Sequence, residues 1–218
     1  MHFEFLVEDL SGSKMLNILV PKIIDFSSNK NTLKIHTYSG IGKIPKNEKV
    51  VNQIRNRMLL NNLPKMLKSY GKCFQGFNGI VVIVCDLDKR CQKDFRNELL
   101  ALLENCDPKP RALFCFAIEE MEAWLLGDFN AIKRAYPNIK VKIINHYKND
   151  DICNTWELLA DAIYKGGSQA LLKKSYKEIG TEKSKWAENI SSKMDIENNL
   201  SPSFCYFRDK LRSLTDNP

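Results

Sequence analysis

Apolar residues in the first 130 residues follow patterns typical of β-strands at four places. Residues 3–7 and 33–38 alternate between apolar and polar side chains, as half-buried strands do. Residues 79–85 and 111–118 are short apolar runs, and the first of them is rich in β-branched residues. Runs of this length and composition are typical of strands buried on both faces of a parallel sheet.

Stretches with helical spacing separate these strands. Residues 14–25 carry apolar side chains at helical intervals, with Ser13 as the expected N-cap. Residues 48–70 form a longer helical stretch, with an interruption expected near Pro64, and residues 92–104 follow the third strand. Alternation of strand and helix predicts an α/β fold with a parallel sheet flanked by helices.

The last third of the chain has a different pattern, which predicts a helical C-terminal part. Gly166-Gly167 and Pro202 separate its segments. Short helices are expected at residues 156–164, 169–179, 185–194 and 203–214, and a short edge strand at residues 139–144. We therefore expect an α/β domain over residues 1–130 and a mostly helical extension, packed on it, over residues 131–218.

Composition narrows the class of protein. With 218 residues, 44% apolar and 27% charged, the chain is long enough to form a core and is unlike a disordered protein. It has no apolar run of the roughly 18 residues that a membrane span needs, and no basic leader, so we expect a cytoplasmic protein. Its seven cysteines form no CxxC pair, which favours reduced thiols over disulfides or a zinc site.

The net charge of +7 is compatible with a polyanionic partner such as nucleic acid. Lysines are concentrated in residues 43–72 and 165–185.

Against this basic background, acidic residues follow three of the predicted strands. They are Glu8, then Asp86 and Asp88, then Glu119, Glu120 and Glu122. Because parallel strands end at the same edge of a sheet, these carboxylates are expected to converge there. Carboxylate oxygens are the ligands that Mg²⁺ and Mn²⁺ prefer, and such an ion supports phosphoryl transfer. The alternative is that these acids are helix caps and turn residues, with residues 119–122 as the first turn of a helix.

Several segments resemble the Toprim superfamily, and more specifically an uncharacterised Toprim-like family of bacterial proteins. Phe5-Leu6-Val7-Glu8, followed by a loop and a helix, resembles the opening of Toprim domains, and Val84-Cys85-Asp86-Leu87-Asp88 resembles their DxD strand. Further matching segments are residues 19–24, 40–45, 63–67, 86–91, 118–128 and 201–204. The matching segments run nearly from end to end of the chain.

This resemblance implies the fold of topoisomerases, primases and OLD-type nucleases. It assigns Glu8 as general acid/base or metal ligand, and Asp86 and Asp88 as ligands of Mg²⁺. Glu120 and Glu122 match the acidic pair that precedes the family's tryptophan, and Glu119 is an additional neighbour. Members are often encoded beside AAA-type ATPases in defence or mobile loci, which implies such an ATPase as a partner.

The loop after Glu8 departs from the Toprim pattern. Asp9 stands where a glycine is usual, and Ser11, Gly12 and Ser13 stand where many members carry a further acid.

Two lysines are candidate phosphate contacts. Lys14 lies at the start of the first expected helix, and Lys43 follows Gly40-Ile41-Gly42, a loop without P-loop spacing. The alternative for both is an ordinary solvated lysine.

The leading hypothesis is therefore a Mg²⁺- or Mn²⁺-dependent nuclease acting on DNA or RNA. A second hypothesis is a non-catalytic component that binds nucleic acid or an ATPase partner. A third is hydrolysis or sensing of a nucleotide or another small phosphate. The oligomeric state is left open by the sequence.

Overall fold

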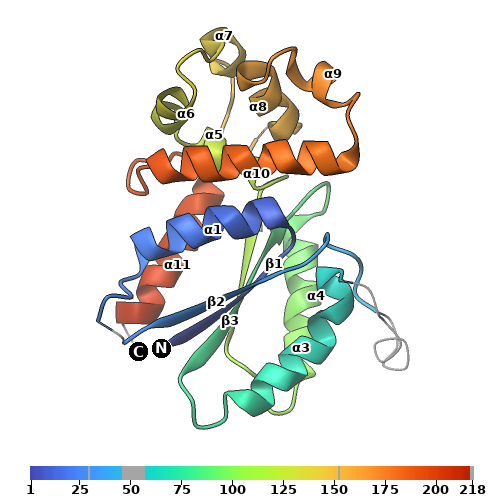
Figure 1. Cartoon of the computed structure of the whole chain (residues 1–218). Helices are drawn as coiled ribbons and strands as arrows, with labels where there is room; N and C mark the ends of the chain where they lie inside the picture. The colour runs from blue at the N-terminus through green and yellow to red at the C-terminus, as the bar shows by residue number, and fades with distance from the viewer. Residues whose placement is uncertain (29, 46–56, 152, 217–218) are drawn as a thin grey trace.

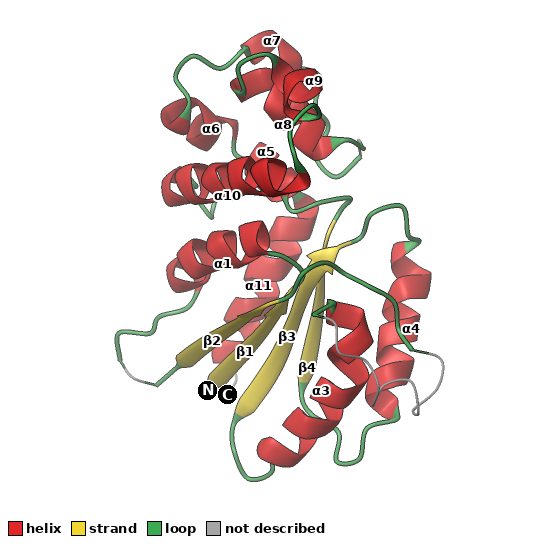
Figure 2. Cartoon of the chain, turned by 45° about the vertical axis from the view of Figure 1, so that its right-hand side comes forward, coloured by secondary structure: helices red, strands yellow, loops and turns green. Residues whose placement is uncertain are grey.

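A computed structural model describes residues 1–28, 30–45, 57–151 and 153–216, and its centre is a four-stranded sheet. The strands are β1 (His2–Val7), β2 (Thr32–Thr37), β3 (Gly79–Asp86) and β4 (Ala112–Ala117). They lie in the order β2-β1-β3-β4, and every neighbouring pair is parallel (Figure 2). The predicted parallel α/β fold is confirmed, with each strand within two residues of its expected bounds.

Helices cover both faces of this sheet. The first face packs against α1 (Leu10–Ile23) and α11 (Pro202–Asp216), and the second against α3 (Leu59–Cys73) and α4 (Gln92–Glu104) (Figures 1 and 2). Alternate side chains of β1 and β3 belong to the two layers: Phe5 and Val82 to the first, Leu6 and Ile83 to the second. Burial on both faces explains why β3 is an unbroken apolar run.

The C-terminal part continues the first of these layers. Helix α10 (Tyr176–Lys193) packs along α1, and Phe207 of α11 contacts Phe5 of β1 with ring centroids 6.4 Å apart. One hydrophobic cluster joins side chains from β1, α1, α10 and α11. Shorter helices lie beyond α10 (Figure 1): α5 (Glu122–Leu126), α6 (Phe129–Ala135), α7 (Val141–Ile144), α8 (Thr155–Ile163) and α9 (Gly167–Leu171).

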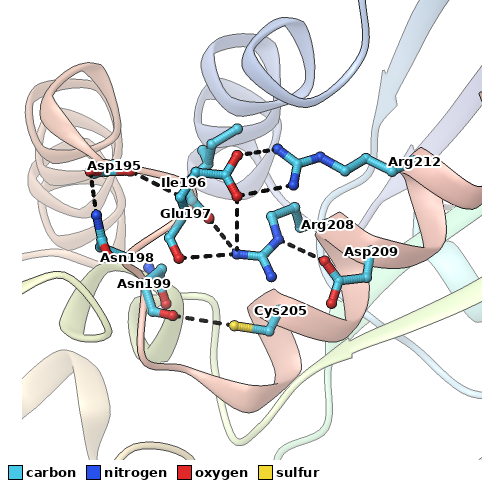
Figure 3. Close-up of polar contacts among 9 residues, drawn as sticks. All are labelled: Asp195, Ile196, Glu197, Asn198, Asn199, Cys205, Arg208, Asp209 and Arg212. Atoms are coloured by element: carbon cyan, nitrogen blue, oxygen red, sulfur yellow. Dashed lines mark hydrogen bonds and ion pairs between the residues drawn. The ribbon is translucent and has the colours of Figure 1, made fainter.

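The connection from α10 to α11 is held by side chains of α11. The Glu197 carboxylate accepts hydrogen bonds from Arg212, and Arg208 Nη1 donates to the backbone oxygen of Ile196 at 2.7 Å (Figure 3). Asn198 Nδ2 donates to Asp195 Oδ2 at 2.8 Å within the same connection. These bonds fix the direction in which α11 returns to the sheet.

The start of the first helix differs from the prediction. Helix α1 begins at Leu10, not after Ser13, because Asp9 is its N-cap and accepts from Gly12 N at 2.7 Å. Gly12 fits closely here: a Cβ would lie 3.0 Å from Val7 Cγ1 and 3.1 Å from Asp9 Oδ1, so a larger residue would require these side chains to shift.

The predicted interruption at Pro64 is wrong. Residues 48–56 of the expected helix lie outside the described residues. The described part of it, α3, continues without a break through Pro64 to Cys73. The proline removes one backbone donor, while burial of Leu60, Leu63 and Leu67 holds the helix together.

Two expectations for the C-terminal part are also wrong. Residues 139–144 contain helix α7 rather than an edge strand, because a short apolar run does not distinguish the two by its spacing. Residues 176–193 form one helix rather than parts of two, since Ser175 and Glu178 form a capping box that starts α10 there. Among the described residues, no helix has both the length and the apolar character needed to cross a bilayer.

Candidate functional site

Glu8 and Asp86 meet at the carboxyl end of the sheet. Their strands are neighbours, and Glu8 N donates to Val84 O at 3.3 Å just past the last paired residues. The Glu8 carboxylate accepts from Asp86 N at 3.1 Å. The parallel register thus places side chains that are distant in sequence next to each other, as expected for strand ends.

Neither carboxylate of this pair is well neutralised. Burial, and then the charges of Asp88 and Asp9, raise the pKa of Glu8 to about 7, while the Asp86 N–H opposes the rise. Burial and the neighbouring Glu8 raise the pKa of Asp86 well above its usual range. Asp86 Oδ1 is buried and has no hydrogen-bond partner in the described part of the chain. A buried carboxylate oxygen without a partner is costly, which makes this atom a candidate ligand of a cation.

Asp88 lies beside this pair but points its carboxylate elsewhere. Its Oδ2 accepts from Arg90 Nη1 at 2.9 Å, and its side chain is 47% exposed. Asp88 and Glu119 both have positive φ, 50° and 63°, and Asp88 N donates to Glu119 O at 2.9 Å. Two strained residues therefore form the turns after β3 and β4, a type of strain that is concentrated at functional sites.

Glu119 has a structural contact instead of a place among the converging acids. Its carboxylate accepts from the backbone N–H groups of Asn154 and Thr155, the latter at 2.9 Å, and so caps the start of α8. It does not lie in the first turn of a helix as the alternative prediction had it, because α5 begins at Glu122.

Glu120 and Glu122 form an ion-paired cluster with Lys183, a residue that sequence reasoning missed. Lys183 Nζ lies 3.7 Å from Glu120 Oε1 and 3.3 Å from Glu122 Oε2, and 6.0 Å from the centre of the Trp156 ring. Lys183 comes from α10, within the lysine-rich segment 165–185. One signal was available: residues 179, 183, 186 and 190 have the spacing of the buried face of a helix.

Burial and the charges of the neighbouring groups shift the pKa values of Glu120, Glu122 and Lys183. Burial raises the pKa of Glu120 to about 8 and raises that of Glu122, while Lys183 opposes both shifts. Burial alone would lower the pKa of Lys183, but Glu122 and Glu120 raise it above its usual value. The ammonium group is therefore a fixed positive charge inside the acidic site.

The two candidate phosphate-binding lysines form no contact with this site among the residues that the structure describes. Lys14 Nζ pairs with Glu188 Oε1 of α10 at 2.9 Å. Lys43 is exposed, and its backbone N–H donates to Asn61 Oδ1 at 2.7 Å. Lys14 thus ties α1 to α10, and Lys43 has a solvated side chain.

The predicted metal ligands fit a divalent cation only in part. Within residues 1–28, 30–45, 57–151 and 153–216, no three His, Cys, Asp or Glu side chains are arranged to hold one ion together. Glu8 and Asp86 nevertheless offer hard oxygen donors, and Asp86 Oδ1 is unpartnered. Mg²⁺ commonly takes only one or two protein carboxylates and fills its coordination with water and substrate phosphate. The donor set of Glu8 and Asp86 therefore suits such an ion.

Comparison with known proteins places the chain in a family. No curated protein and no solved structure matches it. A family model described as a domain of unknown function, DUF4276, matches residues 7–212. This match spans all four strand ends and the acidic site, and the chain belongs to the DUF4276 family.

Proposed function

We propose that the protein is a divalent-cation-dependent phosphoryl-transfer enzyme, a nuclease acting on DNA or RNA. The observation that supports this most is the Glu8–Asp86 pair, with a buried carboxylate oxygen that has no partner among the described residues. Repelling carboxylates at the carboxyl ends of parallel strands are stabilised when a cation binds between them. The Toprim resemblance remains a prediction and points to the same residues.

Each residue of the site has a distinct part in this proposal. Asp86 holds the cation, and Asp88 joins it only if it leaves Arg90. Glu8, at hydrogen-bond distance from the Asp86 backbone and with a pKa of about 7, moves a proton to or from the reacting water. A bound divalent cation would supply charge stabilisation of the phosphoryl oxygens.

The surface charge supports a polyanionic substrate. The chain carries a net charge of +7, and Lys65 and Lys72 of α3 are exposed on the second face of the sheet. Exposed lysines track a phosphate backbone without sequence preference, so binding should weaken steeply with salt. An AAA-type ATPase partner and a role in phage defence stay predictions from the resemblance.

A second candidate function is non-catalytic binding of nucleic acid or of a protein partner. Lys183 favours it, because its ammonium group already neutralises Glu120 and Glu122 without any metal. Under this candidate the acidic site is a structural element and the basic surface does the binding.

Metal titration of the wild type, Asp86→Asn and a control separates the two candidates. The control is Asp94→Asn, an exposed carboxylate in the first turn of α4. Ligands that bind only the folded state raise its melting temperature. We expect Mg²⁺ or Mn²⁺ to raise the melting temperature of the wild type and of Asp94→Asn, and to leave that of Asp86→Asn unchanged.

Cleavage of plasmid, single-stranded DNA and RNA is then measured with the same three proteins. We expect metal-dependent cleavage by the wild type and the control alone. Equal metal response in Asp86→Asn would contradict the assignment of the site. Metal binding without cleavage of any of these substrates would leave non-catalytic binding as the better explanation.

A further inference from the structure

A pocket of about 450 Å³ lies between β2 and α3, apart from the converging carboxylates. Its lining residues come from the carboxyl end of β2 and the first turns of α3, and they are Ile35, His36, Thr37, Tyr38, Arg57, Asn62 and Met66. β2 is one of the two edge strands of the sheet (Figure 2), and its side chains remain at least partly exposed. The volume lies within the range of about 300–1,000 Å³ typical of small-molecule sites.

Backbone hydrogen bonds connect this pocket to the candidate active site. Tyr38 N donates to Val7 O at 2.9 Å, and Gly40 N donates to Glu8 O at 2.9 Å. A group held in the pocket would therefore lie one strand away from the Glu8 carboxylate.

A buried carboxylate orients the histidine of the pocket. Glu4 is 8% exposed, and its Oε2 lies 2.6 Å from His36 Nε2 and 3.3 Å from the Tyr70 hydroxyl, which donates to it. The other carboxylate oxygen lies 3.2 Å from His2 Nε2. A carboxylate accepts hydrogen bonds, so Nε2 of His36 donates to Glu4 and leaves Nδ1 free of that contact. In the doubly protonated ring Nδ1 also donates, and it is in this form that His36 contacts an anion.

The lining of the pocket favours an anion. Its described lining residues include no carboxylate, and Arg57 supplies a guanidinium group that forms no ion pair with any described residue. Burial and the charge of Glu4 raise the pKa of Tyr38, so its hydroxyl stays protonated and is able to donate. Arginine and histidine with neutral donors around them are a common set for recognising phosphate oxygens.

We propose that this pocket binds a phosphate-bearing, nucleotide-sized group, namely the nucleotide next to the phosphate that the Glu8–Asp86 site attacks. The inference rests on the proposed function for its placement in a substrate, but the binding itself does not need a metal. Arg57 contacts the phosphate, and His36, held by Glu4, contacts it from the strand.

Calorimetry with adenosine 5′-monophosphate and inorganic phosphate, in EDTA, tests this inference. Arg57→Gln removes the guanidinium charge, and His36→Gln keeps an amide donor toward Glu4 while removing ring Nδ1. Lys93→Gln is the control, because it removes an exposed positive charge of α4 outside the pocket. Melting temperatures of all variants confirm that they fold.

We expect the wild type and Lys93→Gln to bind the nucleotide equally, and Arg57→Gln and His36→Gln to bind it at least tenfold more weakly. Tenfold corresponds to about 1.4 kcal/mol. Absence of nucleotide binding by the wild type, or equal binding by all four proteins, would overturn the inference. Binding of phosphate with the affinity of the nucleotide would show that an anion alone is recognised, and would overturn the nucleotide-sized ligand.

Asp86→Asn separates failure of this inference from failure of the proposed function. If nucleotide binding depends on Arg57 and His36 while the metal response does not depend on Asp86, the pocket is supported and the nuclease proposal is wrong. If the metal response depends on Asp86 but nucleotide binding does not depend on Arg57 or His36, the pocket inference alone is wrong.

Discussion

Replacing Glu8 by glutamine should stabilise the metal-free protein at pH values above about 4.5, and most strongly at pH 7 and above. Glutamine keeps an oxygen that accepts the Asp86 N–H, which lies 3.1 Å from the Glu8 carboxylate. It removes the charge that burial and the neighbouring Asp88 and Asp9 disfavour. The wild-type residue is then a cost to folding that is retained for its chemistry.

The magnitude follows from the pKa of Glu8. Its pKa rises from 4.5 to about 7 on folding. Since one pKa unit is about 1.4 kcal/mol, full ionisation of Glu8 lowers the free energy of unfolding by about 3 kcal/mol at most. The carboxyl is protonated in both states below pH 4.5, so no stability is lost there. The loss begins above pH 4.5, grows as pH rises, and is complete above about pH 7.

Thermal unfolding in EDTA at pH 4.5, 6 and 8 measures this effect. One kcal/mol corresponds to about 2–4 °C for a chain of this size, so Glu8→Gln should melt roughly 5–10 °C above the wild type at pH 8. At pH 4.5 the two should melt together. The matched control is Glu98→Gln, which removes an exposed carboxylate of α4 away from the site.

Mg²⁺ provides the complementary measurement at pH 8. It should raise the melting temperature of the wild type toward that of Glu8→Gln and have a smaller effect on the variant. A melting difference between Glu8→Gln and the wild type that is the same at all three pH values would refute the reasoning, because a packing change does not titrate.

Three further predictions concern stability. Lys183→Met should lower the free energy of unfolding at pH 8 by about 3–5 kcal/mol, because it leaves two buried carboxylates unpaired; adding Glu122→Gln should recover part of the loss in urea unfolding. Glu119→Ala should cost about 1–2 kcal/mol through loss of the cap on α8, and amide exchange in the first turn of that helix should quicken; unchanged exchange would exclude the cap. Phe207→Ala should cost about 3–5 kcal/mol in urea unfolding, since its buried ring packs on Phe5; a cost below 1 kcal/mol would mean that α11 is not part of the core.

The sheet and part of the acidic site were predictable because local patterns determine them. β3 is apolar up to Cys85 because helices pack on both of its faces. The first polar residue of the strand marks the point where this packing ends. Asp86 stands at that point, and the parallel register brings Glu8 beside it. Strand ends are therefore positions where sequence alone places side chains in space.

The remaining contacts depend on distant elements, which no local pattern encodes. Glu119 caps α8 through residues 35 and 36 positions away, so its role is decided by a helix that the acidic cluster does not predict. Lys183 is brought to Glu122 by the packing of α10 on α1. Residues 139–144 also depend on context, since their short apolar run fits a strand or a helix equally well until it packs against α8.

The carboxylates of the acidic cluster differ in whether the fold itself supplies their hydrogen-bond or ion-pair partners. Glu119 is bonded to backbone amides, and Glu122 to Lys183, so both are satisfied by the fold itself. Glu8 and Asp86 are less well satisfied: the Glu8 carboxylate accepts from the backbone N–H of Asp86, and one oxygen of Asp86 lacks a partner among the described residues. The fold pairs Lys183 directly with Glu120 and Glu122, whereas Lys183 acts on Asp86 only as a more distant charge and no described residue forms an ion pair with Glu8 or Asp86. The charge of this second pair is therefore left to be balanced from outside. That contrast argues for a cation at Glu8 and Asp86 more strongly than the number of acidic residues does, because acids with partners inside the fold need no ligand.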